Sequence, residues 1–296
     1  MSKLHNTMTL TMTLPLVYHP DYAPAGLEHF ARLRVVAEMA QAEALGEFYL
    51  PQPVTRADLQ GLHDDAYLDA VLTGTLPLAS SAYLPWSAQL VNACLHMLGG
   101  QLLGAQLALT HGRCINLACG FHHAHPNTGG GFCLLNGLAL VAHAMPKLKV
   151  AVLDCDEHGG DGTEAFAKRL SNLHTFSVFG SRFGVRGGLR SRALQVPGAC
   201  TPAVDSLYLE VLDQALEEVL ALAPDLVIYQ AGMDSHEHDP RATLKVNTAT
   251  LARRDQIVFA TFRQAQIPVL GVLAGAYQGP QQVAELYLNL LLAALH

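Results

Sequence analysis

The sequence predicts an α/β protein with a mostly parallel β-sheet that is flanked by helices on both faces. From about residue 87 to the end, short apolar or β-branched runs alternate with longer segments whose apolar residues recur at helical spacing. Such alternation is typical of parallel sheets, because the connecting helices pack on both faces. No repeat, low-complexity stretch or Gly/Ser-rich linker divides the chain, so we expect residues 1–296 to form a single domain.

The individual elements follow from the spacing of apolar residues. Helices are expected over residues 27–45, 55–72, 87–110, 134–145, 161–171, 203–222, 249–265 and 280–294. Strands are expected over residues 114–118, 150–153, 175–178, 226–229 and 269–273. The segment 180–202, which is rich in glycine and arginine, is expected to be a surface loop.

The composition argues against several classes of function. Half of the 296 residues are hydrophobic and 15% are charged, which suits a large buried core. The formal net charge of −7 argues against a nucleic-acid-binding face. The six cysteines form no Cys-x-x-Cys pair, and no signal peptide or transmembrane run is recognisable. We therefore expect a cytoplasmic protein without a membrane span, and no feature of the sequence specifies an oligomeric state.

The most informative segment follows the expected strand 150–153. Asp154, Asp156 and His158 alternate there, so an extended backbone would direct all three side chains to one side. Two carboxylates and an imidazole held together would repel and desolvate one another unless a cation lay between them. The alternative is a solvated acidic turn in which Asp161 caps the following helix.

Polar side chains follow three further strands in the same way. His122 and His123 follow the strand 114–118, Asp234 follows 226–229, and Tyr277 follows 269–273. Ligands of open parallel sheets bind beyond the carboxyl ends of the strands, so we expect all of these groups to meet at one edge.

Asp156, His158 and Asp234 would then form a metal site of two carboxylates and one imidazole. Three protein ligands leave positions open for water and substrate, which is typical of a catalytic site. Zn²⁺ suits these ligands, and so do Fe²⁺, Co²⁺ and Mn²⁺.

The remaining polar groups at this edge could carry out acid–base chemistry. His122 or His123 could transfer protons, with Asp154 and Asp161 available to orient the two rings. The phenol of Tyr277 could donate to a developing oxyanion. Together these parts indicate metal-assisted hydrolysis of an amide.

These same residues resemble the zinc-dependent histone deacetylase family, which has the arginase–deacetylase fold. The motifs that carry the resemblance are Gly120-Phe121-His122-His123-Ala124, Gly131-Phe132-Cys133-Leu134-Leu135-Asn136, Asp154-x-Asp156-x-His158-x-Gly160-Asp161-Gly162, Ala231-Gly232-Met233-Asp234 and Gly275-Ala276-Tyr277. They occur in the order of the family and span nearly the whole chain. Thr128-Gly129-Gly130-Gly131-Phe132-Cys133 and Arg253-Arg254-Asp255 are similar to the class IV branch and its bacterial relatives.

The resemblance implies a role for each site residue. It implies that Asp156, His158 and Asp234 bind Zn²⁺, with Fe²⁺ as a further possibility. It pairs His122 with Asp154 and His123 with Asp161, makes His123 the general base, and makes Tyr277 the oxyanion donor. The implied substrate pocket consists of Gly131, Phe132 and Cys133, and a structural K⁺ would draw on Asp154, Asp156, His158, Ser177 and Val178. The arginine of the inner cavity would be Arg32 or Arg34.

The implied substrates are acylated lysine side chains of proteins or peptides. Class IV character, together with the absence of side chains at residues 129–131, leads us to expect that acyl chains longer than acetyl are accepted at least as well as acetyl. The alternative is an acetylpolyamine amidohydrolase. An arginase-like site with two Mn²⁺ ions would need an acid at position 160, where this chain has glycine.

Overall fold

The computed structural model describes residues 13–296, which contain an eight-stranded sheet whose neighbouring strands are all parallel. The strands are β1 (Pro15–Val17), β2 (Glu47–Tyr49), β3 (Arg113–Cys119), β4 (Val150–Asp154), β5 (Leu173–Phe179), β6 (Ser191–Gln195), β7 (Leu226–Ala231) and β8 (Val269–Leu273). They lie in the order β2-β1-β3-β8-β7-β4-β5-β6. The predicted parallel α/β architecture is therefore confirmed.

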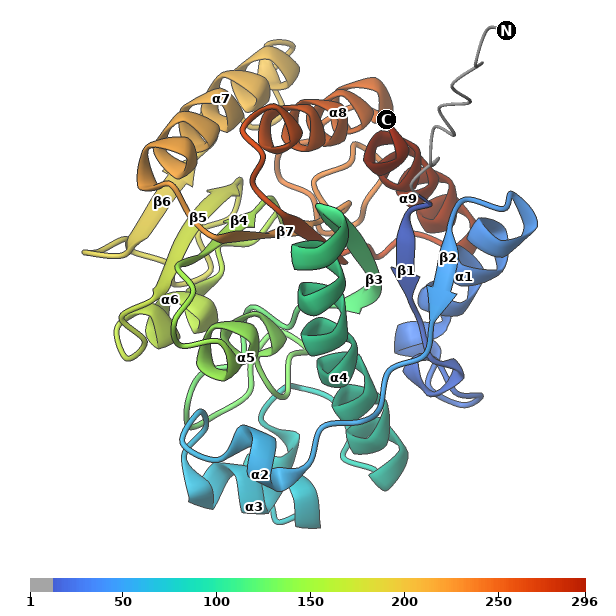
Figure 1. Cartoon of the computed structure of the whole chain (residues 1–296), viewed down its shortest axis with the longest axis vertical. Coiled ribbons are helices and arrows are strands. Elements are labelled where there is room, and N and C mark those ends of the chain that lie inside the picture. Colours follow the sequence, from blue (N-terminus) through green and yellow to red (C-terminus); the bar gives the residue numbers. More distant parts are fainter. Residues whose placement is uncertain (1–12) are drawn as a thin grey trace, which may run out of the picture.

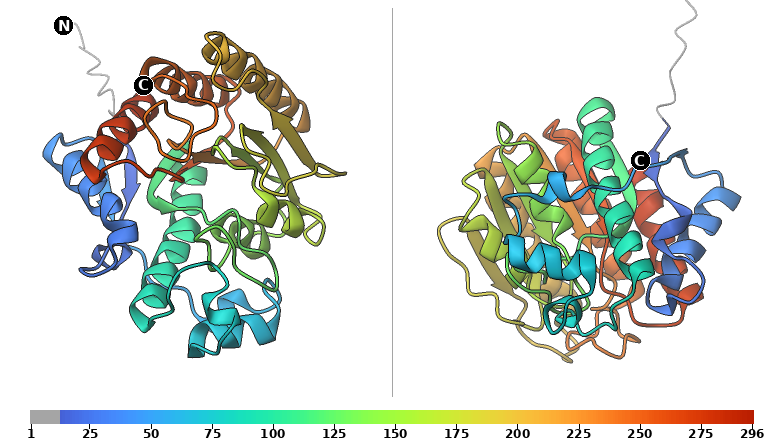
Figure 2. Two further views of the ribbon diagram at one scale, coloured as in Figure 1. Left: turned by 180° about the vertical axis from the view of Figure 1, so that it is seen from behind. Right: turned by 90° about the horizontal axis from the view of Figure 1, so that it is seen from below.

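Helices cover both faces of this sheet (Figures 1 and 2). One face carries α1 (Ala31–Ala42), α7 (Val204–Leu222), α8 (Thr248–Gln264) and α9 (Pro280–Leu295). The other face carries α4 (Ala88–His111), α5 (Gly137–Ala144) and α6 (Asp161–Ala167). The short helices α2 (Arg56–Leu59) and α3 (Asp65–Thr73) lie beyond this second layer. Because both faces are covered, every residue of β4, β7 and β8 is buried.

The ends of the helices are set by local chemistry. Ser87 Oγ accepts a hydrogen bond of 3.0 Å from Leu90 N–H and so caps α4. Asn136 caps α5 in the same way, through a 2.9 Å bond from Ala139 N–H. Helix α4 ends at Gly112, whose φ of 80° is a left-handed conformation that favours glycine.

Three features of the fold differ from the prediction. The segment 55–72 is divided into α2 and α3, because Gly61 has a φ of +79° that no helix can contain. The segment 180–202 contains the strand β6, which pairs with β5, in place of a continuous loop. The strands β1 and β2 were not predicted, since three residues are too few to show a periodic pattern.

The four central strands lie in the order β3-β8-β7-β4, and these are the strands after which the sequence places its polar motifs. Their parallel direction brings all four carboxyl ends to one edge of the sheet. Within residues 13–296, no helix combines the length and the apolarity that a bilayer crossing requires.

Candidate active site

Asp156, His158 and Asp234 lie together beyond the carboxyl ends of β4 and β7. One potential ligand atom of each residue lies within 4.8 Å of the others. His158 Nδ1 is 3.3 Å from Asp156 Oδ1 and 3.1 Å from Asp234 Oδ2. Asp156 is 3% exposed and Asp234 is fully buried. The three side chains that the sequence suggested as metal ligands therefore meet at one point.

The surroundings of these carboxyl groups suit a cation. Asp156 Oδ2 accepts a 2.7 Å hydrogen bond from Gly275 N–H, and Asp234 Oδ1 accepts a 2.9 Å bond from Glu157 N–H, which leaves Asp234 Oδ2 to His158. A Cβ atom at position 275 would collide with both carboxyl groups, so glycine is needed there. Burial raises the pKa of Asp234 to about 7, and the negative charge of Asp156 adds to the shift. A divalent cation would relieve both effects, and two oxygens with one imidazole nitrogen suit Zn²⁺ or Fe²⁺.

Two histidine–aspartate pairs lie beside these three residues. His122 Nδ1 is 2.7 Å from Asp154 Oδ2, and His123 Nδ1 is 2.7 Å from Asp161 Oδ1. The pairing is the one that the resemblance implied. His125 Nε2 also contacts Asp161, at 2.9 Å from Oδ2, so this carboxyl group holds two imidazoles. In both pairs the contact at Nδ1 orients the ring and leaves Nε2 for other partners.

The two paired histidines differ in protonation. Burial alone would lower the pKa of His122, but the negative charges of Asp154 and Asp156 outweigh it and raise the pKa to about 9. Burial lowers the pKa of His123 to about 4, and the positive charge of His122 acts in the same direction. At neutral pH, His122 is therefore an imidazolium and His123 a neutral imidazole.

The position of Asp161 decides between a site and an acidic turn. Asp161 is the first residue of α6, Gly160 occupies the capping position, and no side chain caps the helix. The Asp161 carboxyl group is directed instead to His123 and His125. Asp161 therefore serves the histidine cluster and does not cap the helix, as the turn alternative would require.

Tyr277 lies at the wall of the cavity, where its backbone and its ring each contact a neighbouring residue. Its backbone N–H donates a 2.7 Å hydrogen bond to Asp239 Oδ2. The guanidinium of Arg241 lies 4.7 Å from the centre of the Tyr277 ring and 5.0 Å from that of Phe132. Burial raises the pKa of the Tyr277 phenol well above its usual value, and the charge of Asp234 adds to this. The phenol is therefore a protonated hydrogen-bond donor at any pH near neutrality.

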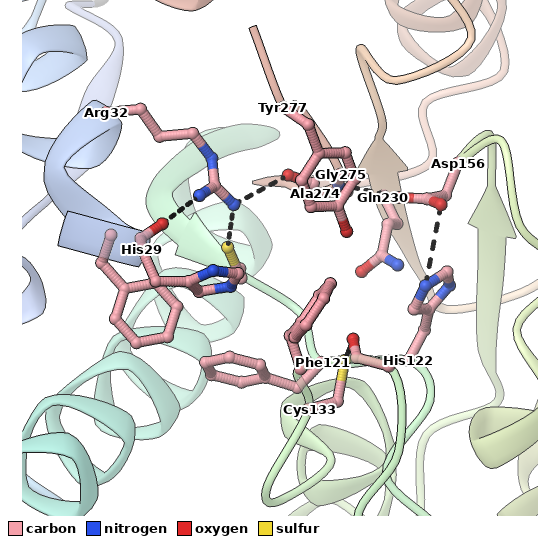
Figure 3. A pocket seen from close by; sticks show the side chains of 14 residues that line it. His29, Arg32, Phe121, His122, Cys133, Asp156, Gln230, Ala274, Gly275 and Tyr277 are labelled. Atoms are coloured by element: carbon pink, nitrogen blue, oxygen red, sulfur yellow. Dashed lines mark hydrogen bonds and ion pairs between the residues drawn. The ribbon is translucent and has the colours of Figure 1, made fainter. Parts of the chain in front are cut away.

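The inner arginine is Arg32. Its guanidinium donates to Ala274 O at 3.3 Å and lies 3.2 Å from Cys119 Sγ, and it points into the cavity from α1 (Figure 3). Arg34 lies on the outer side of α1, half-exposed, where it pairs with Glu38 at 3.9 Å. Arg32 and Arg34 lie on different sides of α1, and it is Arg32 that lines the cavity.

The cavity beside Tyr277 is small, with a volume of about 30 Å³. Its lining, part of which Figure 3 shows, consists of His29, Phe30, Arg32, Cys119, Phe121, His122, Gly131, Phe132, Cys133, Asp156, Gln230, Ala274, Gly275 and Tyr277. The three residues predicted for the substrate pocket, Gly131, Phe132 and Cys133, all belong to it.

The glycines of the motif do not open this cavity. A Cβ atom at Gly131 would collide with the ring of His123, and Gly131 also has a φ of +47°. A Cβ atom at Gly129 would lie 2.9 Å from Cys133 O and 3.0 Å from Ala82. These glycines allow backbone and rings to approach closely, which is the opposite of leaving free volume for a long acyl chain.

The residues assigned by resemblance to a monovalent cation lie on the neighbouring strands β4 and β5 (Asp154, Ser177 and Val178) and in the segment that follows β4 (Asp156 and His158). Asp154 is in register with Ser177. Asp154 Oδ1 accepts a 3.1 Å hydrogen bond from Asp156 N–H, and Ser177 Oγ accepts one of 3.4 Å from Gly160 N–H. Val178 is fully buried. The cation itself stays a prediction.

Two residues at this site were missed by sequence reasoning. The Phe183 ring lies 3.9 Å from the ring centre of His123 and 5.7 Å from that of His158, although Phe183 is 43% exposed. An isolated aromatic residue within an Arg/Gly-rich segment was the available signal. His125 was visible in the sequence but had no assigned partner.

A fully buried arginine supports the loops that carry the acidic residues. Arg254 Nη1 donates a 2.6 Å hydrogen bond to Gly232 O, two residues before Asp234, and Nη1 also contacts Cys155 O at 3.5 Å. Its charge is balanced by Asp255, 2.9 Å from Nε. Arg254 thus links the two loops from which Asp156 and Asp234 project.

Comparison with known proteins agrees with this geometry. The family model described as "Histone deacetylase domain" matches residues 27–294. The chain therefore belongs to the histone deacetylase family and is a deacetylase-type amide hydrolase.

Individual relatives extend the comparison. An uncharacterized protein of Picosynechococcus is 36% identical over 281 residues, which cover 90% of this chain and 93% of the relative. Histone deacetylase 2 of Arabidopsis thaliana is 28% identical over 77% of this chain and 62% of its own length. The crystal structure of an acetylpolyamine aminohydrolase from Burkholderia pseudomallei superposes with a TM-score of 0.79 at 20% identity, covering 95% of this chain and 98% of that one.

Proposed function

We propose that this chain is a metal-dependent lysine deacetylase that hydrolyses the amide of acetyl-lysine in a protein or peptide. The observation that carries the proposal is the convergence of Asp156, His158 and Asp234 with two histidines, His122 and His123, whose pKa values shift in opposite directions, beside one small cavity. The ion we propose is Zn²⁺, with Fe²⁺ as the alternative. When bound, such an ion would polarise the acyl carbonyl and lower the pKa of a water molecule in the site.

The residues of the chain would divide the remaining work. His123 is neutral with Nδ1 committed to Asp161, so its Nε2 can accept the proton of the attacking water and later deliver it to the leaving amine. His122 stays protonated and stabilises negative charge on the reacting carbonyl. The phenol of Tyr277 donates to the same oxygen. Water adds to the carbonyl carbon, the C–N bond breaks, and acetate and a free lysine amine result.

The lining of the cavity favours acetyl over longer acyl groups. The rings of Phe30, Phe121 and Phe132 line it, so a chain of many methylenes, each contributing about 0.8 kcal/mol only when buried, would need these rings to move apart. The space beside Gly129 and Gly131 is occupied by Ala82 and His123, so these glycines give no reason to expect long acyl chains. We therefore place acetyl-lysine ahead of longer acyl-lysines.

Arg241 favours a lysine side chain over a polyamine. Its guanidinium is exposed and lies over the rings of Phe132 and Tyr277, at the wall of the cavity. An acetylated polyamine carries further ammonium groups, which this charge would repel. Similarity to an acetylpolyamine amidohydrolase of Burkholderia pseudomallei, 30% identical over 53% of this chain and 48% of that protein, keeps such substrates as the second candidate.

The proposal is tested with the zinc-loaded enzyme and a panel of substrates. We expect kcat/KM for an acetyl-lysine peptide to exceed those for octanoyl-lysine, myristoyl-lysine and monoacetylated polyamines by at least about tenfold, since a tenfold ratio needs only about 1.4 kcal/mol. The variant Arg241→Glu should raise the relative rate on acetylated polyamines, while Arg241→Lys, which keeps the charge, should not. A preference for acetylated polyamines that neither substitution changes would favour an acetylpolyamine amidohydrolase.

The proposal has two further parts, a structural K⁺ and a reducing compartment. A structural K⁺ near Asp154, Asp156, His158, Ser177 and Val178 is supported by the register of β4 and β5. A reducing compartment such as the cytoplasm is supported by the six cysteines, which are all free thiols in the described residues.

A further inference from the structure

A second cluster of potential ligands lies outside the active site. His19 and Asp21 belong to the segment that follows β1, where Pro20–Tyr22 form a single 3₁₀ turn, and His96 lies on α4. One potential ligand atom from each of the three residues lies within 4.8 Å of the others. Asp21 Oδ2 is 3.9 Å from His19 Nδ1 and 3.8 Å from His96 Nε2. None of the three residues lines the catalytic cavity.

The surrounding contacts orient His96 and Asp21, two of the three potential ligands. His96 Nδ1 lies 2.9 Å from the carbonyl oxygen of Asn92, so Nδ1 carries the proton and Nε2 has a free lone pair. Asn92 Nδ2 donates a 3.0 Å hydrogen bond to Asp21 Oδ2, which fixes the carboxyl group. Asn92 and His96 are one helical turn apart and so share a face of α4. Histidines and carboxylates that bind metals are usually oriented by hydrogen bonds of this kind.

The two elements that carry the cluster are firmly held. Tyr22, which follows Asp21, is fully buried, and its hydroxyl donates a 2.9 Å hydrogen bond to Asn116 on β3. The rings of His19 and His96 are stacked, with centroids 4.2 Å apart. The side chains of His19, Asp21 and His96 are 20%, 44% and 10% exposed, so the site opens to solvent on the side of the carboxylate.

We propose that His19, Asp21 and His96 form a second binding site for a divalent transition-metal ion, with zinc as the ion we expect. Two imidazole nitrogens and one carboxylate oxygen suit Zn²⁺, Co²⁺ and Ni²⁺, and three protein ligands leave the exposed side for water. Ligand atoms around Zn²⁺ lie about 3.3 Å apart. The separations of Asp21 Oδ2 from His19 Nδ1 and His96 Nε2, 3.9 Å and 3.8 Å, would therefore shorten on binding. Coordination through His19 Nδ1 would replace the hydrogen bond that this nitrogen accepts from Asp21 N–H.

Binding at this site would fasten the segment after β1 to helix α4. An ion that binds only the folded protein stabilises it according to its free concentration and affinity. The expected role is therefore structural, and it does not depend on the chemistry proposed for Asp156, His158 and Asp234.

The test measures zinc stoichiometry after equilibrium dialysis of the purified, folded chain. We expect two equivalents for the unmodified protein, and one for His96→Ala and for Asp21→Asn, which keeps the shape of the side chain. His111→Ala is the matched control, because it removes a histidine from the same helix and should leave two equivalents. Titration with Co²⁺, followed by its visible absorption, should show the same loss of one site.

The outcomes separate this site from the catalytic one. Asp234→Ala should also bind one equivalent, and the variant with both Asp234→Ala and His96→Ala should bind none. The second site would be overturned if His96→Ala and Asp21→Asn each bound two equivalents of zinc. It would also be overturned if the unmodified protein bound a single equivalent and His96→Ala still bound it. A single equivalent that His96→Ala removes and Asp234→Ala does not would support the second site and contradict the catalytic one.

Discussion

His122 and His123 are adjacent in the chain, and each is held through Nδ1 by an aspartate at 2.7 Å, yet their pKa values shift in opposite directions. The difference comes from what else lies near each pair. Asp154 contacts His122, and Asp156 adds a second negative charge 3.8 Å from its Nε2. At His123, burial and the positive charge of His122 outweigh the charge of Asp161, whose carboxyl group also contacts His125.

This comparison teaches that the same local motif can supply two different groups. A histidine beside two carboxylates becomes a positive charge when their attraction outweighs burial, whereas its neighbour becomes a neutral base when burial and the adjacent positive charge outweigh its carboxylate. We therefore assign proton transfer to His123 and electrostatic stabilisation to His122.

The largest effect should come from removing the base. His123→Ala should lower kcat by about 10²–10⁴-fold, the range that a positioned general base contributes. His122→Ala should lower it less, because a charge near the carbonyl is lost but the proton acceptor stays. Steady-state kinetics of both variants, with zinc content measured alongside, provide the check; a larger loss for His122→Ala would reverse the assignment.

The oxyanion donor should have the next largest effect. Tyr277→Phe removes one hydroxyl and should cost about 3–4 kcal/mol, or about 10²–10³-fold in kcat. Zinc content should stay unchanged, since the ring, with its packing against Arg241, is kept. Activity within a few-fold of the unmodified enzyme would show that the phenol is not the donor.

The two aspartates should affect opposite sides of the pH profile. Asp154 raises the pKa of His122, so Asp154→Asn lowers that pKa. Because His122 must be charged, activity is lost as pH rises through its pKa, and the alkaline limb of kcat/KM should move to lower pH. Asp161 raises the pKa of His123, so Asp161→Asn lowers it. Because His123 must be neutral, the acidic limb should also move to lower pH.

These two shifts are measured on profiles of log kcat/KM, with the unmodified enzyme as reference. Movement of the same limb in both variants would mean that one macroscopic titration serves both histidines and that their roles are not distinct.

The smallest effect should come from His125. His125→Gln leaves Asp161 with one imidazole instead of two, so its attraction for the His123 proton increases. The pKa of His123 should rise by less than about one unit, because a single hydrogen bond contributes about 0.5–1.5 kcal/mol. The acidic limb should move slightly to higher pH with kcat at the plateau unchanged. A shift to lower pH would show that His125 does not compete for Asp161.

Much of the site could be predicted because a parallel sheet gathers its strand ends. Asp156, His158 and Asp234 come from two strands that pair directly, so their meeting follows from topology alone. The pairings of His122 and His123 came from resemblance, since spacing along the chain does not say which carboxyl group each ring contacts.

The remaining features depend on packing that a single sequence does not display. Arg32 and Arg34 differ only by the rotation of α1. The burial of the His123 ring lowers its pKa but leaves no pattern in the sequence. Gly131 is needed for contact with the His123 ring, and the sequence alone made it look like the floor of an open pocket.

The central claim, that of the two adjacent histidines one is protonated and the other neutral at neutral pH, is tested most directly by ¹⁵N NMR of labelled histidine side chains. The protein is titrated from pH 4 to pH 10 with and without zinc, and His122→Ala and His123→Ala assign the signals. The account predicts that His122 is protonated and His123 neutral at pH 7, with the pKa of His122 above that of His123 in both forms. Two neutral rings at pH 7, or a higher pKa for His123, would contradict it.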